Sequence, residues 1–256
     1  FFLNTSHFSK KYKYIILILF IFFLIGIMLT GERSNTIKAF LGFVIFYFIN
    51  NNFDIKQKLF SILLIFSIIG SLFFHSEFIR LRFGTQFLKP ILNVSTLIFE
   101  KLNPSALSKK TYKQTYQIKV FYDNLYFILY KSGFSVFKNY PIFGVGNKNY
   151  RLETCKEITK SGYLCNTHPH QVYFEFLAEH GLIGSIILIF LLFNLIFIKL
   201  GIILRSKNYI QIGCLIFLLT SFTPLLPTGS FFGDFNLTLF WINLALMYSV
   251  GKKTNI

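Results

Sequence analysis

The residues best suited to chemistry lie in one segment, 140–184, which leads directly into an apolar run. Two histidines, His168 and His170, stand shortly before that run, and no serine or cysteine lies at a spacing typical of a hydrolase triad. Imidazole is the side chain that most readily exchanges a proton near neutral pH. Ionisable groups at the edge of a membrane span usually mark a substrate site. The segment therefore indicates acid–base chemistry at a membrane surface.

The residues around His170 predict a helix N-terminus. Pro169 fits the first turn of a helix, because its missing N–H costs nothing there, and Val172 follows at helical spacing. The helix dipole would keep the His170 imidazole neutral and able to accept a proton, and the free backbone donors could receive a phosphate oxygen. Glu175 and Glu179 share one face of this helix, and we expect that face to be a solvated interfacial edge.

The upstream stretch PIFGVGNKNY is rich in glycine and basic, but it is not a phosphate-binding loop of the Walker type, because no strand-then-helix pattern surrounds it. Gly144 and Gly146 by themselves are typical of turns. Lys148 and Arg151 follow them and favour contact with an anion. We therefore assign all four residues to substrate binding.

Cys155 and Cys165 bracket nine residues of this segment. A disulfide between them would contribute roughly 2–3 kcal/mol by the chain-entropy estimate. Its use would be to fix the approach to the histidines. The alternative, a metal site with His168 and His170, has the wrong spacing for a zinc module, and we expect no metal.

Arg33 is the remaining candidate, at the end of the first apolar run. An arginine there could be an anchor that extends to the membrane interface. The polar neighbours Gly31, Glu32, Ser34 and Asn35 favour a functional role instead, since an anchor does not need them. Both interpretations are open at this point.

The composition is that of an integral membrane protein. Hydrophobic residues make up 54% of the 256 residues and charged residues only 14%, whereas a soluble domain carries about 25% charge. The net charge of +16 fits basic loops on the cytoplasmic side of a membrane. It does not indicate nucleic-acid binding, because the lysines are scattered between apolar runs and form no basic helix.

Six apolar runs predict membrane spans, at 14–30, 36–50, 59–74, 181–204, 209–226 and 231–250. The basic clusters before the first run, between the second and third, between the fourth and fifth and after the sixth all fall on one side, which we expect to be the cytoplasm. The predicted fold is all-α: a polytopic transmembrane bundle with three helices in 1–74, a large and mostly helical periplasmic loop at 75–180, and three helices in 181–256.

The predicted loop is too long to be a simple connection and should have a structure of its own. Its first part, 75–102, resembles an interfacial helix, in which Arg80 and Arg82 would anchor to lipid head groups. A second helix should end at Tyr140, because Pro141 disfavours helix at the residue before it.

Three motifs in order resemble the O-antigen ligase and polymerase superfamily of bacterial membrane glycosyltransferases. His170 and Gln171 are followed by nine residues and Gly181; a proline–glycine stretch spans 141–146; and Thr-Gly-Glu-Arg ends the first run at Arg33. The resemblance implies further spans before residue 1, so we expect this chain to be a C-terminal portion.

The resemblance also implies a reaction without metal or nucleotide cofactor in the bacterial inner membrane. The donor would be a glycan on undecaprenyl diphosphate, and the acceptor a hydroxyl of lipid A-core or another saccharide. His170 and Arg33 would be catalytic, with Gln171 and His168 among the substrate contacts. Members often carry another arginine where this chain has Tyr126, so the second cation for the diphosphate is unassigned, with Lys119, Lys131 and Arg151 as candidates.

Three functions are compatible with these features. We expect an O-antigen ligase, because the histidine motif is complete. A polymerase, whose acceptor is another lipid-linked repeat, is the alternative. A transporter or flippase of lipid-linked saccharide is a third, although it would place charges in mid-span around a cavity, and the six predicted spans carry almost none.

Overall fold

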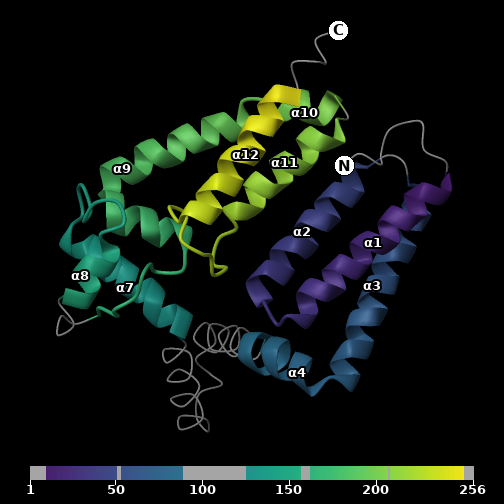
Figure 1. Ribbon diagram of the computed structural model, residues 1–256, viewed down its shortest axis with the longest axis horizontal. Helices are drawn as coiled ribbons and strands as arrows, with labels where there is room; N and C mark the ends of the chain where they lie inside the picture. Colours follow the sequence, from purple (N-terminus) through teal and green to yellow (C-terminus); the bar gives the residue numbers. More distant parts are fainter. Residues whose placement is uncertain (1–9, 51–52, 89–124, 157–161, 207, 251–256) are drawn as a thin grey trace, which may run out of the picture.

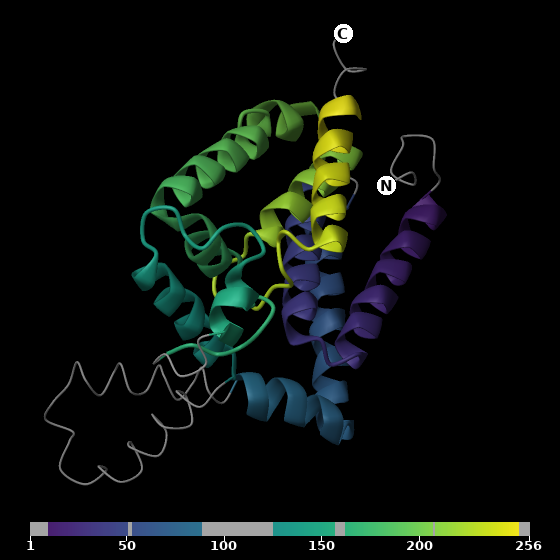
Figure 2. The same cartoon turned by 60° about the vertical axis from the view of Figure 1, so that its left-hand side comes forward.

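The computed structural model describes residues 10–50, 53–88, 125–156, 162–206 and 208–250. In these ranges every regular element is a helix and no strand occurs, which agrees with the predicted all-α class. The first residues of α1 and the last of α12 lie at one end of the molecule, at the top of Figure 1. The α1–α2 turn, α4 and the α11–α12 loop lie toward the opposite end (Figures 1 and 2).

The N-terminal part is a group of three helices, α1 (Lys10–Leu29), α2 (Arg33–Ile49) and α3 (Ile55–His75). A small core of Ile21, Phe43, Tyr47 and Ile65 joins them. The Tyr47 hydroxyl donates to Ser61 Oγ at 3.0 Å, so the polar end of this buried ring has a partner.

A short helical segment crosses the end of this group. It consists of α4 (Glu77–Ile79) and the π-helix η2 (Arg80–Leu88). Ile79 and Phe83 are buried against Met28 near the end of α1. The segment is therefore fixed beside the α1–α2 turn (Figure 2).

The C-terminal part contains the main core. Its helices are α7 (Leu125–Asn139), α8 (Tyr150–Lys156), α9 (Val172–Phe197), α10 (Leu200–Ser206), α11 (Tyr209–Ser221) and α12 (Asp234–Val250). Phe176, Leu218 and Phe240 are among its fully buried side chains. Helix α11 packs against both α12 and α2, so it joins the two parts of the molecule.

Two helical stretches, Ile55–His75 and Val172–Arg205, are long and apolar enough to cross a membrane by length and composition. The helices Leu17–Leu29 and Tyr209–Ser221 are apolar but shorter. Large apolar side chains such as Phe22, Phe60 and Phe190 are exposed on α1, α3 and α9, as expected for surfaces that face lipid. Helices occupy all six predicted span positions, and the six-span topology itself stays a prediction.

Two predicted helix boundaries can be compared with the structure. Helix α7 ends at Asn139, one residue before the predicted end and directly ahead of the Tyr140–Pro141 turn. The predicted interfacial helix over 75–102 begins as α4 and η2, and its remainder lies outside the described residues, as does Lys119.

Helix α9 breaks at Gly181, whose backbone is non-helical with φ 62° and ψ −165°. Two backbone bonds of an unbroken helix, from Leu182 N–H to Ala178 and from Ile183 N–H to Glu179, are replaced by four bonds to the loop 141–146. The replacement bonds are Val145 N to Ala178 O at 3.0 Å, Gly146 N to Glu179 O at 2.8 Å, Leu182 N to Pro141 O at 2.8 Å and Ile183 N to Ile142 O at 3.3 Å.

The break needs glycine on both sides. A Cβ on Gly181 would meet the Ile142 carbonyl and would lie 2.6 Å from Gly144 N, and a Cβ on Gly144 would lie 2.6 Å from Gly181 N. Both residues also have positive φ, a conformation that side chains disfavour. Gly144 of the 141–146 stretch and Gly181 of the histidine motif therefore form a single backbone contact.

We predict that Gly181→Ala lowers the free energy of unfolding by about 2–4 kcal/mol, since it adds backbone strain and a steric clash. Unfolding by dodecyl sulfate titration in mixed micelles measures this. Gly70→Ala is the matched control, because Gly70 lies inside α3 with open space around it, and alanine there should be neutral or stabilising. Equal effects of the two substitutions would contradict the proposed role of the contact.

Candidate functional site

Arg33 and His170 lie beside the same aromatic ring. The Arg33 guanidinium carbon is 5.9 Å from the ring centroid of Tyr126, and the His170 ring centroid is 6.1 Å from it in an edge-on arrangement. Arg33 begins α2, Tyr126 lies in the first turn of α7, and His170 precedes α9. Three segments that are far apart in the sequence thus meet here, and we call this group the Tyr126 site.

The two histidine rings lie in close contact, with their planes tilted by 42°. Their ring centroids are 4.0 Å apart, and the His168 Nδ1 lies 2.9 Å from the Thr167 hydroxyl. Pro169 between them is buried and faces α7, where a Cβ on Gly133 would lie 2.8 Å from it. The close approach of α7 therefore fixes the loop that holds both imidazoles.

The helix after His170 begins later than predicted. Helix α9 starts at Val172, and the side-chain oxygen of Gln171 accepts from Tyr173 N at 2.7 Å and Phe174 N at 3.1 Å. The expectation that Pro169 occupies the first turn is wrong, because His170 has φ 56°, a left-handed backbone that a helix cannot include. Gln171, predicted to bind substrate, is 3% exposed and serves as the N-cap.

Burial lowers the pKa of both imidazoles. For His168, burial and then the neighbouring His170 lower the pKa from 6.5 to about 4, while the Thr228 backbone acts in the opposite direction. Burial also lowers the pKa of His170, again against the Thr228 backbone. Both rings are therefore neutral at pH 7, as predicted for His170, although desolvation rather than the helix dipole is the first cause.

The α11–α12 loop is a part of the site that sequence reasoning missed. Thr228 N donates to the His170 carbonyl at 2.8 Å, and the Ser34 hydroxyl donates to the Pro227 carbonyl. The loop thus connects the histidine segment to the residue after Arg33. A signal was available in the sequence, since Pro-Thr-Gly-Ser is a polar stretch between two apolar runs.

The expectation of a solvated edge at Glu175 and Glu179 is wrong. Their exposed fractions are 1% and 2%. Glu175 accepts hydrogen bonds from the Ser230 hydroxyl and from Phe231 N at 2.8 Å. A buried carboxylate needs such partners, and these bonds attach the α11–α12 loop to α9.

Lys148 and Arg151, the basic residues predicted to bind substrate, lie on the segment 140–156. Glu179 Oε2 accepts from Lys148 N at 3.0 Å, and the Lys148 ammonium pairs with Asp234 at 3.1 Å on an exposed surface. Arg151 lies on α8 with an exposed side chain. The structure therefore brings His168, His170 and Arg33 together, whereas Lys148 contacts Glu179 and Asp234.

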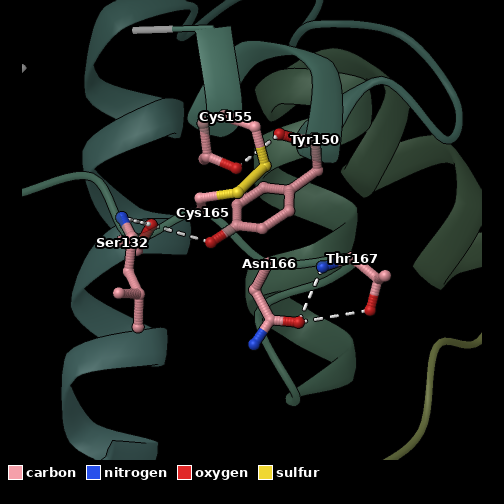
Figure 3. Close-up of a disulfide and its surroundings, with 8 residues drawn as sticks. Ser132, Tyr150, Cys155, Cys165, Asn166 and Thr167 are labelled. Atoms are coloured by element: carbon pink, nitrogen blue, oxygen red, sulfur yellow. Dashed lines mark hydrogen bonds between the residues drawn. A yellow bond between two sulfur atoms is a disulfide. The ribbon is translucent and has the colours of Figure 1, made fainter. Parts of the chain in front are cut away.

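A disulfide links Cys155 to Cys165 (Figure 3). Next to it, the buried Ser132 hydroxyl accepts from Tyr150 Oη at 2.7 Å and from Leu164 N at 2.9 Å (Figure 3). These bonds connect α7, α8 and the segment that leads to the histidines. With both sulfurs in the disulfide, neither cysteine is a thiolate ligand, and no group of three or more metal-binding side chains occurs in the described ranges.

Two buried polar atoms at the site have no hydrogen-bond partner among the described residues, namely His168 Nε2 and Thr228 Oγ1. An unsatisfied buried polar atom is costly in a folded protein. Their positions beside His170 indicate a place where a polar ligand group would be received.

An apolar groove of about 520 Å³ runs along α2 between α1 and α11. Asn35 and Lys38 line it near the start of α2, and Tyr47 and Asn50 line it at the far end. The fifteen helical steps from Asn35 to Asn50 give the groove a length of about 22 Å. Thr220, Ser221 and Asn236 also line the groove, and most of the remaining lining is phenylalanine, leucine and isoleucine.

A family model described as O-antigen ligase matches residues 18–189, which include Arg33, the loop 141–146, both histidines and Gly181. No curated protein and no solved structure matches the chain.

We predict that lowering the pH from about 6.5 toward 4 destabilises the protein partly through His168. In that interval the unfolded imidazole binds a proton and the folded one, with a pKa of about 4, does not. The unfolded state therefore binds more protons, and the free energy of unfolding falls as the pH falls. Unfolding measured at several pH values should show a shallower pH dependence in His168→Gln than in the wild type, and identical slopes would contradict the prediction.

Proposed function

The chain belongs to the O-antigen ligase family, and we propose on this premise that it transfers a glycan from undecaprenyl diphosphate to a sugar hydroxyl. Members of the family are membrane proteins with an O-antigen ligase or polymerase type of function, acting on lipid-linked saccharides. The donor, the acceptor and the residues below are our proposal.

The observation that carries the proposal is the placement of Arg33 and His170 on one ring, Tyr126. A guanidinium stays charged and matches the geometry of phosphate. A neutral imidazole accepts a proton. The reaction needs these two groups at one site. The acceptor hydroxyl forms its new bond to the same anomeric carbon that the diphosphate leaves.

In the proposed reaction the acceptor hydroxyl attacks the anomeric carbon of the donor. His170 takes the hydroxyl proton as the new glycosidic bond forms, and the bond from the anomeric carbon to the diphosphate oxygen breaks. The diphosphate leaves with that electron pair, and Arg33 stabilises its charge. A general base typically contributes ~10²–10⁴ in rate, and one preorganised donor to the leaving charge about 3–4 kcal/mol.

The groove along α2 supports a lipid-linked donor. It has an apolar lining and begins at Asn35, two residues after Arg33. A polyprenyl chain in this groove would therefore carry its diphosphate to the start of α2. The length of the groove, about 22 Å, accommodates several isoprene units.

The remaining predicted contacts have supporting roles in this proposal. His168, with its unpartnered Nε2, would hold the acceptor sugar beside His170, and Gln171 would act by fixing the backbone after it. Gly144 and Gly146 would shape the wall of the site through the α9 contact. Lys148 and Arg151 would attract anionic substrate from the exposed surface.

We further propose that the chain is a multi-pass protein of the bacterial inner membrane with the Tyr126 site on the periplasmic side. The arrangement of basic residues supports this orientation. Lys56, Lys58 and Arg205 belong to ends of helices away from the α1–α2 turn, as expected for the cytoplasmic side. The disulfide is also typical of an oxidising compartment.

The ligase function is proposed over the polymerase function because the histidine motif is complete, and the two share the same donor chemistry. They differ in the acceptor, and therefore in the product that accumulates when transfer stops. Free lipid-linked polymer indicates a ligase, whereas core carrying a single repeat indicates a polymerase.

We predict that His170→Asn abolishes transfer while the protein remains folded in the membrane. Asparagine tolerates the left-handed backbone at φ 56° but cannot act as a base, so the loss should be ~10²–10⁴ in rate. The measurement is polysaccharide transfer in cells that lack the chromosomal copy, with the accumulated product identified. His75→Asn changes an exposed histidine on α3 and is the control. Wild-type transfer by His170→Asn would contradict the assignment of His170 as the general base.

We predict that Arg33→Lys lowers the transfer rate about 10²–10³-fold, because the charge is kept and the two-pronged phosphate contact is lost. Arg205→Lys on α10 is the matched control, since it makes the same exchange at an exposed position. Initial rates with purified protein in nanodiscs measure the effect. Unchanged activity of Arg33→Lys would favour the interpretation of Arg33 as a membrane anchor.

A further inference from the structure

A diphosphate carries at least two negative charges, and the Tyr126 site contains one arginine. The α1–α2 turn approaches a second. Gly31 in this turn has φ 75°, and a Cβ there would lie 3.0 Å from Arg82 Nε and 2.7 Å from Phe78 Cζ. The Arg82 guanidinium therefore lies against the backbone two residues before Arg33.

The position of Arg82 is fixed by its neighbours. Ile79 and Phe83, on either side of it in the sequence, are buried against Met28 at the end of α1. Helix η2 also contacts α2 directly. The side chain of Arg82 is itself partly buried. Its conformational freedom beside the α1–α2 turn is therefore restricted.

Arg80, two residues earlier, gives a direct comparison. Its side chain is exposed, and its Nη1 donates to the Phe74 carbonyl near the end of α3 at 3.3 Å. This is the arrangement expected of a residue that anchors to lipid head groups. The sequence suggested that role for both arginines, but the structure gives Arg82 a different environment, directed toward the turn that carries Arg33.

We propose that Arg82 is the second cation of the diphosphate site and that it binds the lipid-linked donor together with Arg33. This inference rests on the proposed function. A diphosphate has two charged phosphate groups, and a guanidinium beside each of them would stabilise both charges. The glycine at position 31 lets Arg82 approach this closely, since any side chain there would occupy its place.

The experiment measures binding to the full chain in nanodiscs with two probes, farnesyl diphosphate and farnesyl monophosphate. We expect the wild type to bind the diphosphate more tightly. Arg82→Ala should weaken diphosphate binding about tenfold to a hundredfold and monophosphate binding much less. Arg80→Ala should bind both probes with wild-type affinity. The diphosphate affinity of Arg82→Lys should lie between those of the wild type and Arg82→Ala.

The outcomes separate this inference from the function on which it rests. If the wild type binds neither probe, the proposed function fails and the inference fails with it. If the wild type binds the diphosphate and Arg82→Ala binds it equally well, only the role of Arg82 is overturned. A loss in Lys38→Gln without one in Arg82→Ala would likewise overturn it, and would assign the second charge to the groove along α2.

Thermal unfolding of each variant serves as the folding control. A binding loss in Arg82→Ala with an unchanged melting temperature and unchanged monophosphate binding supports the inference. Equal losses for the diphosphate and the monophosphate would contradict it, because they would reflect a general disturbance of the groove rather than the loss of one phosphate contact.

Discussion

The site depends on an exchange of backbone hydrogen bonds between helix α9 and the loop 141–146. At Gly181 two of the helix's own bonds are replaced by four to that loop. The N–H groups of Leu182 and Ile183 and the C=O groups of Ala178 and Glu179 therefore all keep a partner across the break. The exchange requires two glycines whose backbones touch, Gly144 and Gly181, and it joins the segment that bears the histidines to the segment that bears the disulfide.

A second group of contacts joins this unit to the rest of the molecule. Tyr126 lies beside both Arg33 and His170, and the loop after α11 bonds to Ser34 and to His170. The buried carboxylate of Glu175 attaches the same loop to α9. These hydrogen bonds go to backbone carbonyls or to the buried Glu175, so they hold the backbone segments that carry Arg33 and His170 to the same loop.

The sequence supplied the parts that depend on local pattern. Apolar runs predicted the helices, the proline at 141 predicted the end of α7, and motif order pointed to Arg33 and His170. It did not supply the features that depend on contacts between distant segments. From the sequence, Glu175 resembles an exposed helix residue, because its contacts with Ser230 and Phe231 come from a distant loop. Tyr126 stands where an arginine is expected, and its contacts with Arg33 and His170 appear only in the structure. The predicted start of α9 was also wrong, since a glutamine N-cap and a histidine with a left-handed backbone have no strong signal in the local sequence.

The bond from Ser34 to Pro227 spans 193 positions of the chain, which has a consequence for biosynthesis. A ribosome that has made Ser34 must add 193 further residues before Pro227 exists. A nascent chain inserted only as far as α9 thus holds a histidine segment that lacks its Thr228 and Ser230 contacts. Premature termination would therefore leave a fragment in which the Tyr126 site lacks its contacts to the α11–α12 loop.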